Sequence, residues 1–343
     1  MPETLFKIDL TKPMAEQDLP GHNRWHPDIP AVVSVNPGDT FRIECKDWTD
    51  GQIKDNDDPS DVKDVDLTTV PMLSGPNYVN GAQPGDILVV DLVDIGALQG
   101  DEWGFTGIFA KENGGGFLTD HYPEAAKAIW DFQGIYTSSR HIPGVKFAGI
   151  THPGLIGCAP SQELLNKWNK RETELVNTAP DLRTYGAGLS GEDPVLAALP
   201  NPTNAVLGKL DPAEYDRVAA EAARTVPPRE HGGNCDIKNL SRGTRIYFPV
   251  YVEGAKLSMG DIHFSQGDGE ISFCGAIEMS GYVDVHVDII KGGVDKYSMV
   301  NPIFKPGPVE PNYSEYLVFE GISVDEYTGK QYYMDTHIAY RQA

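Results

Sequence analysis

The sequence has few cysteines and no long apolar run. Its four cysteines are far apart and form no CxxC pair, so neither a disulfide framework nor a cysteine-only zinc site is expected. A membrane span would need roughly 18 consecutive apolar residues, and none is present. The first residues lack the basic start and apolar core of a signal peptide. The sequence therefore predicts no membrane partner and a cytoplasmic location.

Positive charge is also scarce. Lysine and arginine number 28 against 50 aspartates and glutamates, which gives a formal net charge of -22. Such a charge repels phosphate backbones and anionic lipid surfaces. We therefore expect no nucleic acid as a partner. Any bound metal would have to use histidine and carboxylate ligands.

Glycine and proline, by contrast, are abundant, at 36 and 26 residues. They indicate many turns and short strands. A Gly-Asp turn followed by apolar residues of strand type recurs at 35–45, 82–95 and 257–273, which hints at a repeated β unit. Further strands are expected at 244–254 and 281–290. The fold class predicted is mainly β (α+β).

Helices are expected mainly in the middle of the chain, at 122–132, 160–175 and 211–226. The last has Asp211 as N-cap, Pro212 at the first helical position and Glu214 in a capping box, and two prolines follow it. We expect a single catalytic unit over 1–343, with a β-rich half at 1–115, a helical or irregular middle at 116–228 and a β-rich half at 229–343.

Two glycine-rich stretches concentrate reactive side chains: EHGGNCD at 230–236 and GDIHFSQGDGE at 260–270. If Asp268-Gly269 is a two-residue turn, the second stretch starts a hairpin over 260–276 in which His263 pairs with Cys274. Because side chains alternate along strands, one face would be apolar and the other reactive. The reactive face would carry Asp261, His263, Ser265, Glu270, Ser272 and Cys274.

Asp261 and His263 are spaced so that a carboxylate and an imidazole can converge on one cation. A third ligand is expected from EHGGNCD, and we favour Asp236 over His231. The two-residue turn would place Glu270 on the order of 13 Å from His263 along the strand. Glu270 would then be a base or a substrate contact, unless the loop is wider than assumed.

These motifs also have ordinary structural interpretations. Gly-Asp and GDGE are common turn sequences, and a histidine on a strand usually serves as a hydrogen-bonding group. No strict metal-binding motif is matched. The metal interpretation rests on the clustering of ionisable residues beside two glycine-rich turns.

Two further segments are candidates for a site. Cys158 comes just before a predicted helix, where the pKa of a thiol can fall, so it is a candidate nucleophile; a buried structural cysteine is the alternative. In HNRWHPDIP at 22–30, Trp25 and His26 could line a site or pack against the edge of the core.

Several long phrases carry a more specific signal, among them HNRWHPDIP, DWTDGQIKDND, SRHIPGVKFAGITHPGLIGCAP, RTVPPREHGGNCDIK and LSMGDIHFSQGDGEISFCGAIEMSG. Over essentially the whole chain they resemble the acetamidase/formamidase family, and within it the formamidase branch. The resemblance implies two related β-rich subdomains and hydrolysis of a small aliphatic amide, above all formamide, to carboxylate and ammonia. It also implies a homo-oligomer and, as in some members, a divalent metal such as zinc or calcium. Because the family continues beyond "DTHIAYRQA", the chain is expected to be truncated at its C-terminal end.

We therefore hypothesise that a divalent metal, zinc or alternatively calcium, activates water for attack on the amide. One rival hypothesis makes Cys158 the nucleophile, and another makes the chain a non-catalytic metal-binding or assembly subunit. In this hypothesis Asp236, Asp261 and His263 bind the metal. Glu270 transfers the proton, with Asp268 and His231 as further catalytic candidates. Asn234 binds the oxyanion, and Trp25 and His26 form a small substrate pocket.

Overall fold

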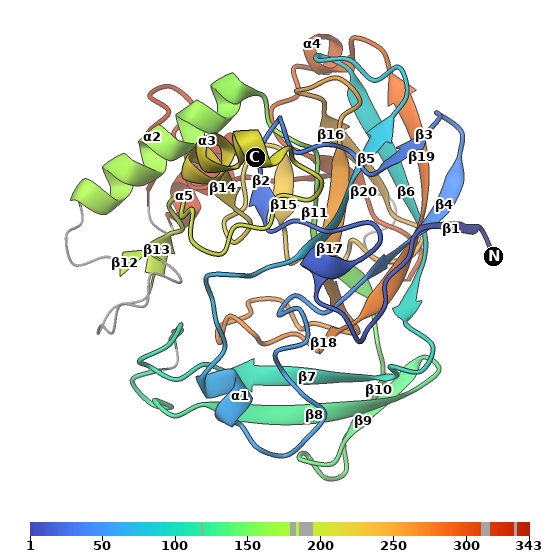
Figure 1. The fold of residues 1–343 in the computed structure, drawn as a ribbon, viewed down its shortest axis with the longest axis vertical. Coiled ribbons are helices and arrows are strands. Elements are labelled where there is room, and N and C mark those ends of the chain that lie inside the picture. Colours follow the sequence, from blue (N-terminus) through green and yellow to red (C-terminus); the bar gives the residue numbers. More distant parts are fainter. Residues whose placement is uncertain (118, 179–182, 185–194, 310–315, 333–334) are drawn as a thin grey trace.

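The computed structural model describes residues 1–117, 119–178, 183–184, 195–309, 316–332 and 335–343. Strands dominate these residues and helices are few (Figure 1), which confirms the predicted fold class. Among the described helices, none is both long and apolar enough to cross a membrane.

One sheet interleaves strands from the two ends of the chain. The C-terminal strand β19 lies between the N-terminal strands β4 and β6, and β16 pairs with the other side of β6. The strand predicted at 281–290 is confirmed as β19, in which Val283, Val285 and Val287 are buried and Asp288 is exposed, while Asp284 is buried in an ion pair with Arg42. In order across the sheet, the strands are β1 (Glu3–Phe6), β4 (Thr40–Cys45), β19 (Gly281–Ile290), β6 (Ile87–Ala97), β16 (Arg245–Pro249), β20 (Ile303–Lys305) and β21 (Val318–Phe319).

A second, larger sheet carries the reactive segments. One end of this sheet is an antiparallel arm formed by β7, β8, β9 and β10, at the bottom of Figure 1, and the other end is formed by β11 and β15. Its order is β10 (Lys146–Ala148), β9 (Tyr136–Ser139), β8 (Ala126–Gln133), β7 (Trp103–Ile108), β18 (Glu278–Met279), β17 (Leu257–His263), β11 (His152–Gly157) and β15 (Gly232–Asn234), while β5 (Leu73–Val79) joins β17 to β3 (Val33–Val35).

The main hydrophobic core joins the two sheets. Leu88 and Val90 of β6 and Val285 of β19 belong to the same buried cluster as Leu257 and Met259 of β17. Removing this apolar surface from water is the main stabilising contribution to such a fold. The core therefore fixes β17, the strand that holds Asp261 and His263, against the seven-stranded sheet.

A helical layer covers the other side of β11. Leu165 and Trp168 of α2 share a buried cluster with Trp25 and Leu155. The helix predicted at 160–175 is confirmed as α2 (Gln162–Thr178). The remaining short elements are η1 (Met14–Glu16), α1 (Ser60–Lys63), α4 (Gly293–Tyr297), α5 (Thr336–Gln342) and the strand pairs β12 (Arg183–Thr184) with β13 (Val195–Ala197) and β2 (Arg24–Trp25) with β14 (Ala223–Arg224).

The helix predicted at 211–226 is present but shorter. Asp211 caps it by accepting a hydrogen bond from the backbone N–H of Ala213, and η2 (Pro212–Glu214) leads into α3 (Tyr215–Glu221). The chain then forms β14, which pairs with β2. The strand pairing, rather than the later prolines, ends the helix.

The helix predicted at 122–132 is wrong. This segment forms β8, which pairs with β7 on one side and β9 on the other. Its alanines favour a helix, but Ile129, Trp130 and Phe132 are buried in the strand pairing. Packing between strands therefore overrides the local propensity.

Candidate active site

The strand that carries Asp261 and His263 pairs differently from the predicted hairpin. Gly260 and Asp261 lie inside β17 rather than in a turn, and His263 is opposite Glu278 of β18. The predicted pairing of His263 with Cys274 is therefore wrong. Backbone hydrogen bonds of Phe264 and Ser265 with Ile277 continue this pairing, so residues 266–276 form a wide loop. Ile277 and Met279 are buried, while Ile271 in the loop is half exposed.

This pairing gathers carboxylates around His263. The Nε2 atom of His263 lies 3.1 Å from Oε2 of Glu278, 3.2 Å from Oδ1 of Asp261 and 4.0 Å from Oδ1 of Asp236. Potential ligand atoms lie within 4.8 Å of one another in two overlapping sets, Asp236 with Asp261 and His263, and His263 with Glu270 and Glu278. The structure thus brings the three predicted metal ligands together.

Glu270 also belongs to this cluster, so the expected distance of Glu270 from His263 is wrong. The wide loop folds back, and the Glu270 carboxylate accepts a hydrogen bond from the backbone N–H of Ala276. A two-residue turn would have kept the two residues on opposite ends of a hairpin. The alternative of a wider loop is the one that the structure adopts.

The buried carboxylates repel one another. Burial raises the pKa of Asp236, and the charges of Glu270 and Asp261 add to the effect. Burial likewise raises the pKa of Glu278 and of Glu270. Burial alone would lower the pKa of His263, but Glu278 and Asp261 raise it well above its usual value. Four carboxyl groups around one imidazole resist losing their protons together, so a bound cation would stabilise their ionised forms.

Glycine keeps space open at the centre of the cluster. A Cβ atom on Gly154 of β11 would lie 2.5 Å from Oδ2 of Asp261, 2.7 Å from Cε1 of His263 and 2.8 Å from Oδ1 of Asp236. That Asp236 oxygen is buried and has no hydrogen-bond partner among the described residues. Convergent carboxylate and imidazole donors around such a space fit a divalent cation.

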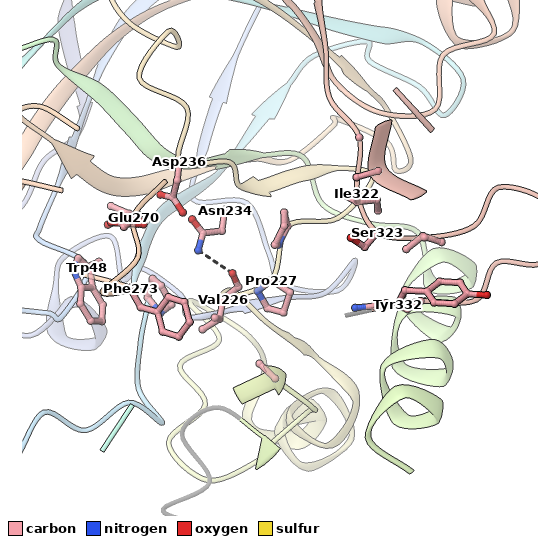
Figure 2. Close-up of a pocket in the computed structure, with 18 of the residues that line it drawn as sticks. Trp48, Val226, Pro227, Asn234, Asp236, Glu270, Phe273, Ile322, Ser323 and Tyr332 are labelled. Carbon is pink, nitrogen blue, oxygen red and sulfur yellow. Dashed lines mark hydrogen bonds between the residues drawn. The ribbon is translucent and has the colours of Figure 1, made fainter. Parts of the chain in front are cut away.

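The cluster opens into a cavity of about 420 Å³. Figure 2 shows Asp236, Asn234 and Glu270 on one side, with Ile322, Ser323 and Tyr332 of the C-terminal segment towards the other. An apolar wall starts at Trp48, below Glu270, and continues through Phe273, Val226 and Pro227 towards the C-terminal segment (Figure 2). The cavity therefore combines a charged end with an apolar surface, as ligand sites commonly do.

Asn234 lines this cavity, but its amide group is oriented for a different role from the one predicted. Its Nδ2 atom donates a hydrogen bond of 2.9 Å to the backbone carbonyl of Val226 (Figure 2). Its Oδ1 atom is buried and unpartnered within the described part of the chain. Asn234 therefore offers an acceptor to a bound amide N–H rather than the predicted oxyanion donor.

Three of the predicted site residues lie in the helical layer instead. Trp25 and His231 are buried with their rings 4.5 Å apart, and the imidazole of His26 interacts with Glu221 of α3. None of the three belongs to the described lining of the cavity. The small substrate pocket predicted from Trp25 and His26 is therefore wrong, and Trp48 and Phe273 line the cavity instead.

Asp268 and Cys158 are also outside the described lining of the cavity. Asp268 is exposed and forms an ion pair with Lys238. Cys158 is fully buried in the main core, and burial raises the pKa of its thiol. A buried thiol that stays protonated is a poor nucleophile, which opposes the first rival hypothesis.

Sequence reasoning missed Glu278, Gly154 and Trp48. Glu278 became visible only once the register of β17 and β18 was known. Gly154 lies in THPGLIG, where nothing marks it as facing a carboxylate cluster, and Trp48 lies in an acidic loop. Their positions depend on contacts between segments far apart in the sequence.

Comparison with known proteins decides the family. A model of the Acetamidase/Formamidase family matches residues 7–343. The chain belongs to this family. It is 61% identical over 341 residues to a formamidase from Methylophilus methylotrophus, covering 99% of this chain and 81% of that protein. It is 57% identical over 351 residues to an acetamidase from Mycolicibacterium smegmatis, covering 100% of this chain and 84% of the relative.

A solved structure also supports membership of the Acetamidase/Formamidase family. The γ-lactamase from Delftia acidovorans is 60% identical and superposes with a TM-score of 0.86, covering 99% of this chain and 81% of that one. The family hydrolyses amides, so this chain is an amidohydrolase, and the rival hypothesis of a non-catalytic subunit is not supported.

Proposed function

We propose that the cavity hydrolyses formamide to formate and ammonia with the help of a divalent cation, zinc in the first place and calcium as the alternative. Asp236, Asp261 and His263 would hold the cation, with Glu278 beside them. The observation that carries this proposal is the unpaired Oδ1 of Asp236, which faces the space left by Gly154 among converging donors.

A cation bound there would supply Lewis acidity to the attacking water and to the amide carbonyl. The water oxygen must bond to the carbonyl carbon, the C–N bond must break, and the water proton must reach the leaving nitrogen. Glu270 suits this proton transfer because burial raises its pKa towards the range of a general base. Asn234 would orient the substrate by accepting an amide N–H at its free Oδ1.

The size of the cavity favours a second substrate class. About 420 Å³ is far more than the three heavy atoms of formamide need, and Trp48 and Phe273 give the wall an apolar aromatic surface. The solved relative from Delftia acidovorans is a γ-lactamase. Small cyclic amides are therefore the second substrates to test.

Metal removal tests the proposal directly. The purified protein should contain at least one equivalent of divalent metal per chain by elemental analysis. Dialysis against a chelator should abolish ammonia release from formamide, and zinc added back should restore it. Full activity at a clearly sub-stoichiometric metal content would refute the metal mechanism, while the substrate assignment would be judged separately by ammonia release from formamide, acetamide and a γ-lactam.

The predictions of a cytoplasmic location and a homo-oligomer remain part of this proposal. Among the described residues all four cysteines are free thiols, which suits a reducing compartment. Sedimentation analysis of the purified protein would determine the number of subunits.

A further inference from the structure

A second histidine stands directly behind His263. His152, the first residue of β11, pairs with His263 across the strands and is fully buried. Its Nδ1 atom lies 2.7 Å from the backbone carbonyl oxygen of Ile150. A carbonyl oxygen can only accept a hydrogen bond. The Nδ1 atom of His152 must therefore carry a proton and donate it.

The other nitrogen of His152 is then an acceptor. The positive charge of the pair belongs on His263, because its Nε2 atom lies 3.1 and 3.2 Å from two carboxylates, whereas His152 faces a backbone carbonyl and an amide. His152 is therefore the neutral ring of the pair. With the proton on Nδ1, its Nε2 atom presents a lone pair. The Nδ1 atom of His263 lies 3.1 Å from that Nε2 atom, and the two rings are nearly perpendicular, at 88°.

The donor in this contact is His263. The amide of Gln266 is the other group near this nitrogen: its oxygen lies 3.2 Å from Nε2 of His152, and its nitrogen has no hydrogen-bond partner within the described residues. Turned over, that amide would donate to the same lone pair. Both neighbours therefore fit Nε2 of His152 as the acceptor and Nδ1 of His263 as a donor. With its proton directed at His152, the imidazole of His263 turns its Nε2 atom towards Glu278 and Asp261.

We propose that His152 is a positioning residue, which accepts the Nδ1–H of His263 and so aims the Nε2 atom of His263 at the carboxylate cluster. The hydrogen bonds run from His263 to His152, both of them buried, and on to the backbone carbonyl of Ile150. A histidine that ligates a metal is commonly oriented through its other ring N–H. The consequence for metal affinity rests on the proposed function; the hydrogen bond itself does not.

A matched pair of substitutions tests the proposal. In His152→Asn the shorter side chain can still donate to Ile150 but does not extend to His263. In His152→Gln the longer amide places an acceptor near the position of Nε2. Zinc dissociation constants should rise about 10- to 100-fold in His152→Asn and by less than about fivefold in His152→Gln. Equal affinities in His152→Asn and the wild type, or equal losses in both variants, would overturn the proposal.

A second measurement needs neither metal nor substrate. In metal-free protein labelled with ¹⁵N-histidine, the Nδ1–H of His263 should give a resonance that exchanges slowly with water in the wild type and in His152→Gln, but not in His152→Asn. If the wild type shows that resonance yet binds no zinc, the metal mechanism fails and the positioning role stands. Thermal unfolding checks that both variants fold. If His152→Asn does not fold, the wild type alone still tests the proposal: absence of the protected Nδ1–H resonance would refute the positioning role of His152.

Discussion

Two buried histidines in this protein have opposite surroundings. His231 lies between Trp25 and Trp168, with ring centroids 4.5 and 4.6 Å away, and neither of its ring nitrogens has a hydrogen-bond partner among the described residues. His263 has Nε2 contacts of 3.1 and 3.2 Å to two carboxylates. Burial lowers the pKa of His231, whereas nearby carboxylates raise that of His263.

The charges around the two histidines differ in the same way. Near His231 each glutamate forms an ion pair with an arginine: Glu230 with Arg171, and Glu172 with Arg229. The side chains of Glu172 and Arg229 are each about 1% exposed. Around His263 the acids outnumber the cations. A matched buried pair adds little net stability but is costly to break, whereas unmatched buried charges are typical of sites that bind or react. The balance of charge, rather than the presence of histidine, separates the structural region from the site.

The largest effect should come from Asp236→Asn. This change removes a proposed ligand while keeping the shape of a residue whose φ of 47° suits asparagine. We expect kcat/KM for formamide to fall by more than about 100-fold, since losing even a partner of a ligand costs 10- to 100-fold. The chelated variant should unfold at the same temperature as chelated wild type or higher, because like-charge repulsion is relieved. If the variant unfolds at a lower temperature but keeps its activity, Asp236 has a structural role and not a catalytic one.

The opposite result is expected for Glu172→Gln. It leaves the guanidinium of Arg229 buried without its counter-charge, which typically costs about 3–5 kcal/mol of folding stability. Denaturant unfolding should show this loss. The kcat of the folded fraction should match the wild type, because neither residue belongs to the described lining of the cavity. A fall in kcat without a change in stability would mean that the paired region takes part in catalysis.

The smallest effect is expected for His231→Phe. The ring nitrogens of His231 make no hydrogen bond to any described residue, so a phenyl ring between the two tryptophans should cost less than about 1.5 kcal/mol. Ammonia release should stay within about twofold of the wild type, because the change removes no contact to the transition state. A pH–rate profile that shifts in this variant would restore the predicted catalytic role of His231.

The loop at 230–236 illustrates how far sequence reasoning reached. Its second half was interpreted usefully, because Asp236 does meet Asp261 and His263 and Asn234 does line the cavity. Its first half was not, because Glu230 and His231 look equally reactive until α2 supplies Arg171 and Trp168. A residue type indicates what chemistry is available, but its partners decide whether that chemistry is used.

By itself the sequence determined the mainly β class, the family, the helix predicted at 160–175 and the spacing of Asp261 and His263. These features depend on composition, local periodicity and long matching phrases, all of which are written along the chain. The tertiary structure alone decided the register that opposes Glu278 to His263, the return of Glu270, the space at Gly154 and the contact with His152. Those features depend on strand pairing and core packing between distant segments, which local patterns do not specify.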